Sequence, residues 1–166
     1  MWAPFWHSEV DRLYDYSSRV GRVEVKTCIG GNRIHKFSHK QLYSTSQEPV
    51  HVVSILLQKE EESAGLTLQQ LIEECRAALR TSPYLVKLER AIRRAGMQEP
   101  TECGPIFNEQ NAARSIQWFH ARDIPHFSEP EPDNVSGTNY SANLGAAQPL
   151  SVTDILDLCT CWKDSV

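Results

Sequence analysis

The clearest change in the spacing of apolar residues lies between residues 57 and 67, and it constrains the fold more than any other feature of the sequence. In residues 22–29, and again in 33–37, apolar and polar residues alternate, which is typical of strands with one buried face. Gly30, Gly31 and Asn32 separate the two runs and tolerate positive φ, so the sequence predicts a β-hairpin. Residues 50–57 are dense in β-branched side chains and predict a third, more buried strand.

Helical spacing replaces the alternation from Thr67 onward. Thr67 and Gln70 have the spacing of a capping box, and the apolar residues that follow keep to one helical face as far as Leu79. Ser82 then caps a second helix that ends at Gly96, so the two helices form an αα-hairpin. We therefore expect an α+β fold, in which a small, mostly antiparallel sheet packs on the αα-hairpin.

Weaker patterns cover the rest of the first 126 residues. Ser8 can cap a short helix over residues 8–17. Residues 97–112 contain Pro and Gly and predict a loop, whereas residues 113–120 fit either a strand or a helical turn.

The length of 166 residues fits one domain, which we assign to residues 1–126. Residues 127–166 are rich in Pro, Ser and Asn, and they contain six acidic residues against a single base, Lys163. This composition predicts a flexible acidic C-terminal arm. Ser151 can cap a short amphipathic helix at the end of the arm.

No apolar run approaches the roughly 18 residues that a membrane-spanning helix needs, and we expect no membrane span. The N-terminus is aromatic but lacks the basic and long apolar regions of a signal peptide. We therefore expect a cytoplasmic or nuclear protein. The five cysteines should then be reduced thiols rather than disulfides.

Four residues of zinc-ligand type lie close together in the sequence: Cys28, His35, His39 and His51. Structural zinc sites commonly take their ligands as close pairs, and the chain has no C-x-x-C pair. Cys159 and Cys161 diverge on the helix predicted for them. We predict no metal site and no cofactor.

Two short motifs resemble the rolling-circle replication initiators, which nick single-stranded DNA. These motifs are His51 in the third predicted strand and the run Tyr84-Leu85-Val86-Lys87. The resemblance implies a metal-dependent nuclease, with His51 as a ligand and Tyr84 as the nucleophile. Val53 stands where the second histidine of that family would be.

A cysteine nucleophile is the other enzymatic alternative. Cys103 precedes Gly104 and Pro105 in a predicted loop, and either His120 or His126 could act as its base. Together with the metal-dependent nuclease, this makes a metal- or thiol-dependent enzyme one alternative function. No complete catalytic set stands out, so we assign no catalytic residue.

Basic residues cluster on the αα-hairpin and predict a surface for phosphates, although a solvated face has the same composition. The members are Arg76, Arg80, Lys87, Arg90, Arg93 and Arg94. A nucleic-acid-binding regulator is therefore a second alternative function.

The favoured hypothesis is a non-enzymatic regulatory or adaptor protein that binds another protein, in the manner of compact viral accessory or structural proteins. Its binding surfaces would be the aromatic N-terminus and the apolar stripe of the C-terminal helix, unless those surfaces complete the domain's own core. The candidate residues are Trp2, Phe5, Trp6, Val152, Ile155, Leu156, Cys159 and Trp162. The oligomeric state is open.

Overall fold

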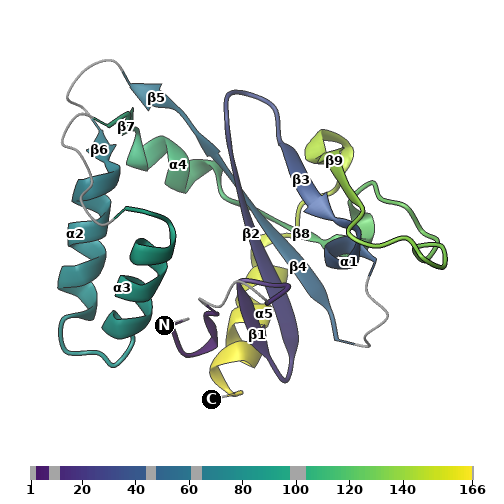
Figure 1. Cartoon of the computed structure of the whole chain (residues 1–166), viewed down its shortest axis with the longest axis horizontal. Coiled ribbons are helices and arrows are strands. Elements are labelled where there is room, and N and C mark those ends of the chain that lie inside the picture. Colours follow the sequence, from purple (N-terminus) through teal and green to yellow (C-terminus); the bar gives the residue numbers. More distant parts are fainter. Residues whose placement is uncertain (1–2, 8–11, 44–47, 61–64, 98–103, 166) are drawn as a thin grey trace.

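A computed structural model describes most of the chain, and its principal feature is a four-stranded sheet with the order β1-β2-β4-β8 (Figure 1). The described residues are 3–7, 12–43, 48–60, 65–97 and 104–165. The four strands are β1 (Tyr16–Ser18), β2 (Gly21–Ile29), β4 (Val50–Leu57) and β8 (Gln117–His120).

Pairing in the principal sheet is antiparallel at both edges and parallel in the middle, between β2 and β4. Two smaller antiparallel sheets accompany it, one of order β3-β9 and one of order β5-β7-β6. Their strands are β3 (Ile34–Ser38), β9 (Asn139–Asn143), β5 (Lys59–Glu60), β6 (Leu66–Thr67) and β7 (Ile106–Phe107). The predicted mixed α+β class with mostly antiparallel strands is confirmed.

The predicted hairpin is correct in its strands and wrong in its pairing. Strand β2 pairs with β1 and β4, whereas β3 pairs with β9 from the other end of the chain. The turn begins at Gly30, which has a φ of 109° and donates its N–H to the carbonyl of Leu57. Alternation identifies a strand but not its neighbour, so β3 could fold over the sheet instead of extending it.

A parallel pair of strands needs a crossover connection, and here the crossover between β2 and β4 contains β3 and the short helix α1 (His39–Leu42). These elements and β9 cover one face of the principal sheet, which we call the α1 face. Its core includes Phe37, Val52, Phe119 and Leu144.

The opposite face is covered by the helix α5 (Val152–Lys163), and we call it the α5 face. Trp162 is 1% exposed and packs with Val23 and Val53, and its ring lies 5.0 Å from that of Phe5 in an edge-to-face contact. Segments of the expected C-terminal arm are therefore packed on the body. Strand β9 forms a ladder with β3, and Trp162 completes the core of the sheet.

The predicted helices of the αα-hairpin are present as α2 (Leu68–Leu79) and α3 (Leu85–Arg94). The capping box of Thr67 and Gln70 is confirmed. Both hydrophobic clusters of the principal sheet are built from other elements among the described residues, and the αα-hairpin lies at the side of the sheet (Figure 1). Leu71 is accordingly 45% exposed.

Two predictions between these elements need correction. Residues 97–112 hold β7 and the start of a short helix, α4 (Glu109–Ser115), where a loop was expected. The helix predicted over residues 8–17 lies partly outside the described residues, and its described part ends in β1, because pairing with β2 overrides a weak helical pattern. None of the described helices is long and apolar enough to cross a membrane.

Candidate active site

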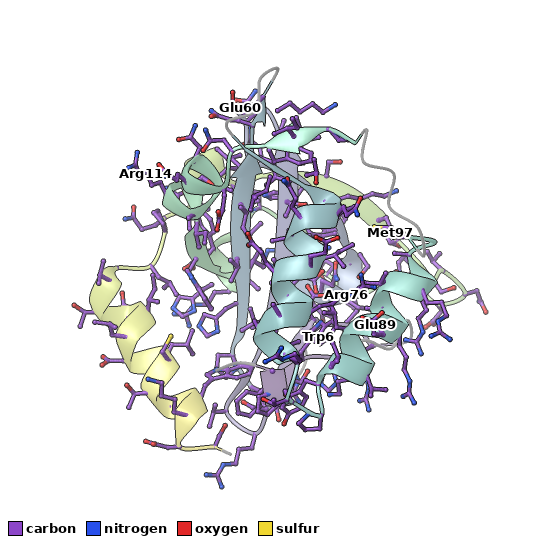
Figure 2. All side chains as sticks on the ribbon, turned by 90° about the vertical axis from the view of Figure 1, so that its left-hand side faces the viewer. Trp6, Glu60, Arg76, Glu89, Met97 and Arg114 are labelled. Atoms are coloured by element: carbon purple, nitrogen blue, oxygen red, sulfur yellow. The ribbon has the colours of Figure 1, made fainter. Side chains whose placement is uncertain are left out.

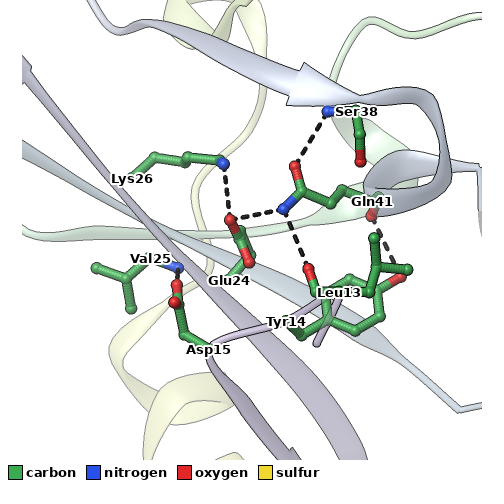
Figure 3. Close-up of polar contacts among 8 residues, drawn as sticks. All are labelled: Leu13, Tyr14, Asp15, Glu24, Val25, Lys26, Ser38 and Gln41. Atoms are coloured by element: carbon green, nitrogen blue, oxygen red, sulfur yellow. Dashed lines mark hydrogen bonds and ion pairs between the residues drawn. The ribbon is translucent and has the colours of Figure 1, made fainter. Parts of the chain in front are cut away.

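The middle of β2 carries two opposite charges on the α1 face. Glu24 and Lys26 are two positions apart, so their side chains share a face, while Val23 and Val25 belong to the core of the α5 face. Glu24 is only 6% exposed. Its Oε1 atom lies 2.6 Å from Nζ of Lys26 (Figure 3).

A second carboxylate comes from the segment that precedes β1. Tyr16 pairs with Val23 in the antiparallel ladder, and this register brings Asp15 alongside the middle of β2. The backbone N–H of Val25 donates a hydrogen bond of 2.7 Å to Oδ2 of Asp15 (Figure 3). The residue between Glu24 and Lys26 therefore holds the aspartate in place.

Gln41 of α1 joins the segments that carry these carboxylates. Its Nε2 donates to Oε1 of Glu24 at 2.7 Å and to the carbonyl of Leu13 at 3.1 Å. Its Oε1 accepts the N–H of Ser38 at 3.1 Å, as the returning half of a capping box (Figure 3). With the amide fixed at both ends, Glu24 and the Asp15 segment are held at a defined distance from α1.

The electrostatics of this cluster favour a bound cation. Burial raises the pKa of Glu24 above its usual value, and repulsion from Asp15 raises it further. The hydrogen bonds and charge of Lys26, with a smaller contribution from Gln41, act in the opposite direction and lower that pKa. The net result is a carboxylate that is costly to ionise, as expected where two acids are brought together without their full complement of positive charge.

The donor set suits a hard divalent cation such as Mg²⁺. Among the described residues no three His, Cys, Asp or Glu side chains gather as a metal cluster. Mg²⁺ does not need such a cluster, because it is usually held by one or two carboxylates together with waters and substrate phosphates. Within the same described part, Oδ1 of Asp15 and Oε2 of Glu24 accept no protein hydrogen bond, so each acid keeps one oxygen for a ligand.

A family model covers this site. It is described as "Putative PD-(D/E)XK family member (DUF4420)" and matches residues 3–144, which is most of the chain. The chain belongs to the DUF4420 family. No curated protein and no solved structure matches it.

The name of the DUF4420 family describes a sequence pattern, and the cluster on β2 fits it. Glu24, Val25 and Lys26 have the order of the (D/E)XK half. Asp15 is the aspartate that contacts this triplet, because the N–H of the middle residue, Val25, donates a hydrogen bond to its carboxylate. Tyr14 precedes Asp15 where the pattern has proline, so the fit at that position rests on the aspartate alone.

Asp15, Glu24, Lys26 and Gln41 are not among the site residues that the sequence predicts. Alternation along the strand places Glu24 and Lys26 on a solvent-facing side, an interpretation that fails because β3, β9 and α1 cover that face. A signal was nevertheless present, since an acid and a base at i and i+2 must lie on the same face of any strand. Asp15 and Gln41 meet these two residues only through tertiary contacts, which the spacing of residues in the sequence does not reveal.

The four residues of zinc-ligand type do not assemble. Sγ of Cys28 lies 4.0 Å from Nε2 of His35, and that ring is hydrogen-bonded to Ser54 at 2.7 Å. His39 of α1 stacks on Tyr43, the residue that follows this helix. His51 projects to the α5 face, where its ring lies 4.8 Å from that of His120.

The motifs shared with rolling-circle initiators lie on separate elements. Burial among positive neighbours lowers the pKa of His51 to about 4, with desolvation as the largest cause and His120 and Arg122 as the others. Tyr84 lies at the start of α3 beside the ammonium group of Lys87. In the thiol alternative, His120 contacts His51, and Cys103 lies outside the described residues.

The candidate partner-binding residues divide between core and surface. Phe5 and Trp162 contact each other beneath the sheet, Trp6, Ile155 and Cys159 are half-buried, and Trp2 lies outside the described residues. Val152 and Leu156 are 74% and 61% exposed on the outer side of α5. Their role in binding another protein stays a prediction.

The basic residues of the αα-hairpin also divide. Arg76 forms a two-point ion pair with Glu89, with distances of 2.7 and 3.0 Å (Figure 2). Lys87 donates to the backbone carbonyl of Trp6 at 3.0 Å. The remaining members are exposed: Arg80, Arg90, Arg93 and Arg94.

Proposed function

We propose that this protein is a divalent-cation-dependent nuclease that hydrolyses phosphodiester bonds in nucleic acid. One observation carries the proposal: the carboxylates of Asp15 and Glu24 and the ammonium group of Lys26 share one site on the α1 face of β2. Membership of the DUF4420 family, whose description names the PD-(D/E)XK pattern, supports the assignment of this site as catalytic.

In this proposal Asp15 and Glu24 hold the cation through their remaining oxygens. A divalent cation bound there would polarise a phosphoryl oxygen and offset the negative charge that develops as water attacks phosphorus. Gln41 keeps Glu24 and the Asp15 segment in register, so that the two carboxylates do not have to reorganise during the reaction.

Lys26 supplies a fixed positive charge beside the carboxylates. Its ammonium group lies 2.6 Å from Oε1 of Glu24 and 5.3 Å from the centre of the Phe37 ring, so contacts on both sides position it. A positive charge held in this way can stabilise the additional charge on a phosphate in the transition state. It also partly neutralises the acids when no cation is bound.

The proposal is tested by incubating the purified protein with DNA and with RNA, with Mg²⁺ or with EDTA. We expect cleavage only with the cation, and a loss of about 100-fold or more in Asp15→Asn, Glu24→Gln and Lys26→Met. Glu89→Gln is the matched control, because it removes an acid with an arginine partner from a different surface. Cleavage by Glu24→Gln at the rate of the wild type would overturn the proposal. A wild-type protein that cleaves neither DNA nor RNA, with Mg²⁺ or with Mn²⁺, would also overturn it.

Cation binding also has a readout that does not depend on activity. A ligand that binds the folded state alone raises the free energy of unfolding by RT ln(1 + [L]/Kd), and the melting temperature rises with it. We expect Mg²⁺ or Mn²⁺ to stabilise the wild type and Glu89→Gln, and to leave Asp15→Asn and Glu24→Gln unchanged. Equal stabilisation of all four proteins would place the cation elsewhere.

A further inference from the structure

A stripe of arginines on α3 is not explained by the packing of the αα-hairpin. Ile92 is buried and Leu88 is half-buried on the inner side of α3, whereas Arg90, Arg93 and Arg94 are exposed. These three residues are spaced by three and four positions, so they share one side of the helix. We call them the arginine stripe.

Two members of the stripe, Arg90 and Arg93, have no ion-pair partner within the described αα-hairpin. Glu89 is the single acid among the residues of α3, and the two-point ion pair with Arg76 of α2 engages both of its oxygens. Among the described residues, Arg90 and Arg93 form no salt bridge. Like charges at this spacing repel each other, and the helix dipole offsets part of this repulsion only at Arg93 and Arg94, which lie in the last turn.

The stripe is joined to the segment that carries the candidate catalytic aspartate. Lys87, one turn before Arg90, donates to the carbonyl of Trp6, and the next residue, His7, donates its N–H to the carbonyl of Asp15 at 2.7 Å. Figure 2 shows that α3 lies on the side of the molecule away from α5. The carboxylates of the site also project away from α5, on the α1 face.

A polar hollow adjoins the stripe between the two helices. It has a volume of about 350 Å³ and is lined by Arg76, Glu89, Ile92 and Arg93. Arginine suits such a position because its planar group can donate two parallel hydrogen bonds to a phosphate.

We propose that the arginine stripe binds the sugar–phosphate backbone of nucleic acid and holds it beside the site of Asp15 and Glu24. The inference rests on the proposed nuclease function, which supplies nucleic acid as the class of substrate. It adds a binding surface on α3, which contains none of the carboxylates of the site and does not contain Lys26. Backbone contacts of this kind position a duplex without reading its sequence.

The test measures binding of a DNA duplex of about 30 base pairs to the Glu24→Gln protein, which separates binding from cleavage, across a series of salt concentrations. Adding Arg90→Gln and Arg93→Gln should weaken binding about tenfold or more and lower the salt slope by about 1.8, since each lost phosphate contact removes roughly 0.9. The matched control adds Arg114→Gln and Lys163→Gln. It removes two exposed charges from α4 and α5, away from the stripe, and should leave the slope nearly unchanged.

Three outcomes overturn the inference: no binding by the Glu24→Gln protein, unchanged binding by the stripe variant, or an equal loss in the control. The inference and the nuclease function can fail separately. Salt-dependent binding through the stripe with no cleavage by the wild type supports the stripe and refutes the nuclease. Cleavage by the wild type, together with an unchanged KM in Arg90→Gln/Arg93→Gln, supports the nuclease function and refutes the role of the stripe.

Discussion

Glu24 is the residue at which the requirements of folding and of the proposed chemistry diverge. Burial and the neighbouring Asp15 make its ionised form unfavourable, and Lys26 and Gln41 offset only part of that cost. A neutral isostere should therefore fold at least as well as the wild type at neutral pH. An electrostatic cost of this kind is typical of sites where charged groups are arranged to bind a ligand.

Gln41 offers a way to test the role of Glu24 without removing it. The hydrogen bond from Gln41 lowers the pKa of Glu24, so Gln41→Leu should raise that pKa. If activity requires the ionised carboxylate, the acidic limb of the pH–rate profile moves to higher pH. The measurement is kcat/KM for nucleic-acid cleavage as a function of pH.

Gln70→Leu is the matched control for this prediction. Gln70 also accepts the N–H of its helix cap, Thr67, and thus plays the same capping role as Gln41 without contacting a candidate catalytic residue. Its pH–rate profile should match that of the wild type. A shift in both variants, or in neither, would contradict the positioning role of Gln41.

At the scale of single residues, the sequence predicted caps and strand positions better than partners. The capping box at Thr67 and the N-cap at Ser151 depend on residues within one turn of the helix, and the sequence predicted both. The site depends on Asp15, Glu24 and Gln41, which meet only because β1 pairs with β2 and α1 folds over them. Sequence spacing contains no such information.

The elements show the same contrast between local and distant signals. Strand β4 and helices α2, α3 and α5 each have a continuous pattern of their own, and each was predicted. Strand β9 lies in a polar segment rich in Pro, Ser and Asn, and its order comes from a ladder with β3, which is about one hundred residues earlier in the sequence. No local property of that segment could have revealed it.

Helix α5 provides a test at the element scale, because its two sides differ sharply in burial. Trp162→Ala removes a side chain that is 1% exposed and should cost about 3–5 kcal/mol of unfolding free energy. Leu156→Ala removes one that is 61% exposed and should change stability by no more than about 0.5 kcal/mol. Denaturant titration of both variants is the measurement.

Equal and small losses in these two variants would mean that α5 does not cover the sheet. Full stability in Leu156→Ala would also leave that residue and Val152 available for contact with another protein, a role that the sequence predicts for the whole apolar stripe of this helix. Trp162 would then be separated from them as a residue of the core.

At the scale of the whole molecule, His51 should make stability depend on pH. Its pKa is about 4 in the folded state against 6.5 for an ordinary histidine, so the unfolded chain takes up a proton first as the pH falls. The stabilising contribution is complete above pH 6.5 and is lost between 6.5 and about 4. The loss is of the order of 3 kcal/mol.

The measurement is the free energy of unfolding at several pH values in that interval, for the wild type and for His51→Leu. The charges facing this histidine belong to His120 and Arg122, and both stay in place in the variant. We expect a clearly smaller dependence on pH in His51→Leu. Parallel curves for the two proteins would show that other groups govern the acid sensitivity.

The boundary of the family match has a consequence for how other members of the DUF4420 family are built. The matched region stops at residue 144, whereas the tryptophan that seals the back of β2 and β4 is residue 162. A member that shares only the matched region would leave Val23 and Val53 open to water, at a cost no chain of this size could easily bear. Such a member would need a segment of its own over that surface, whereas the face that carries Asp15 and Glu24 lies within the matched region.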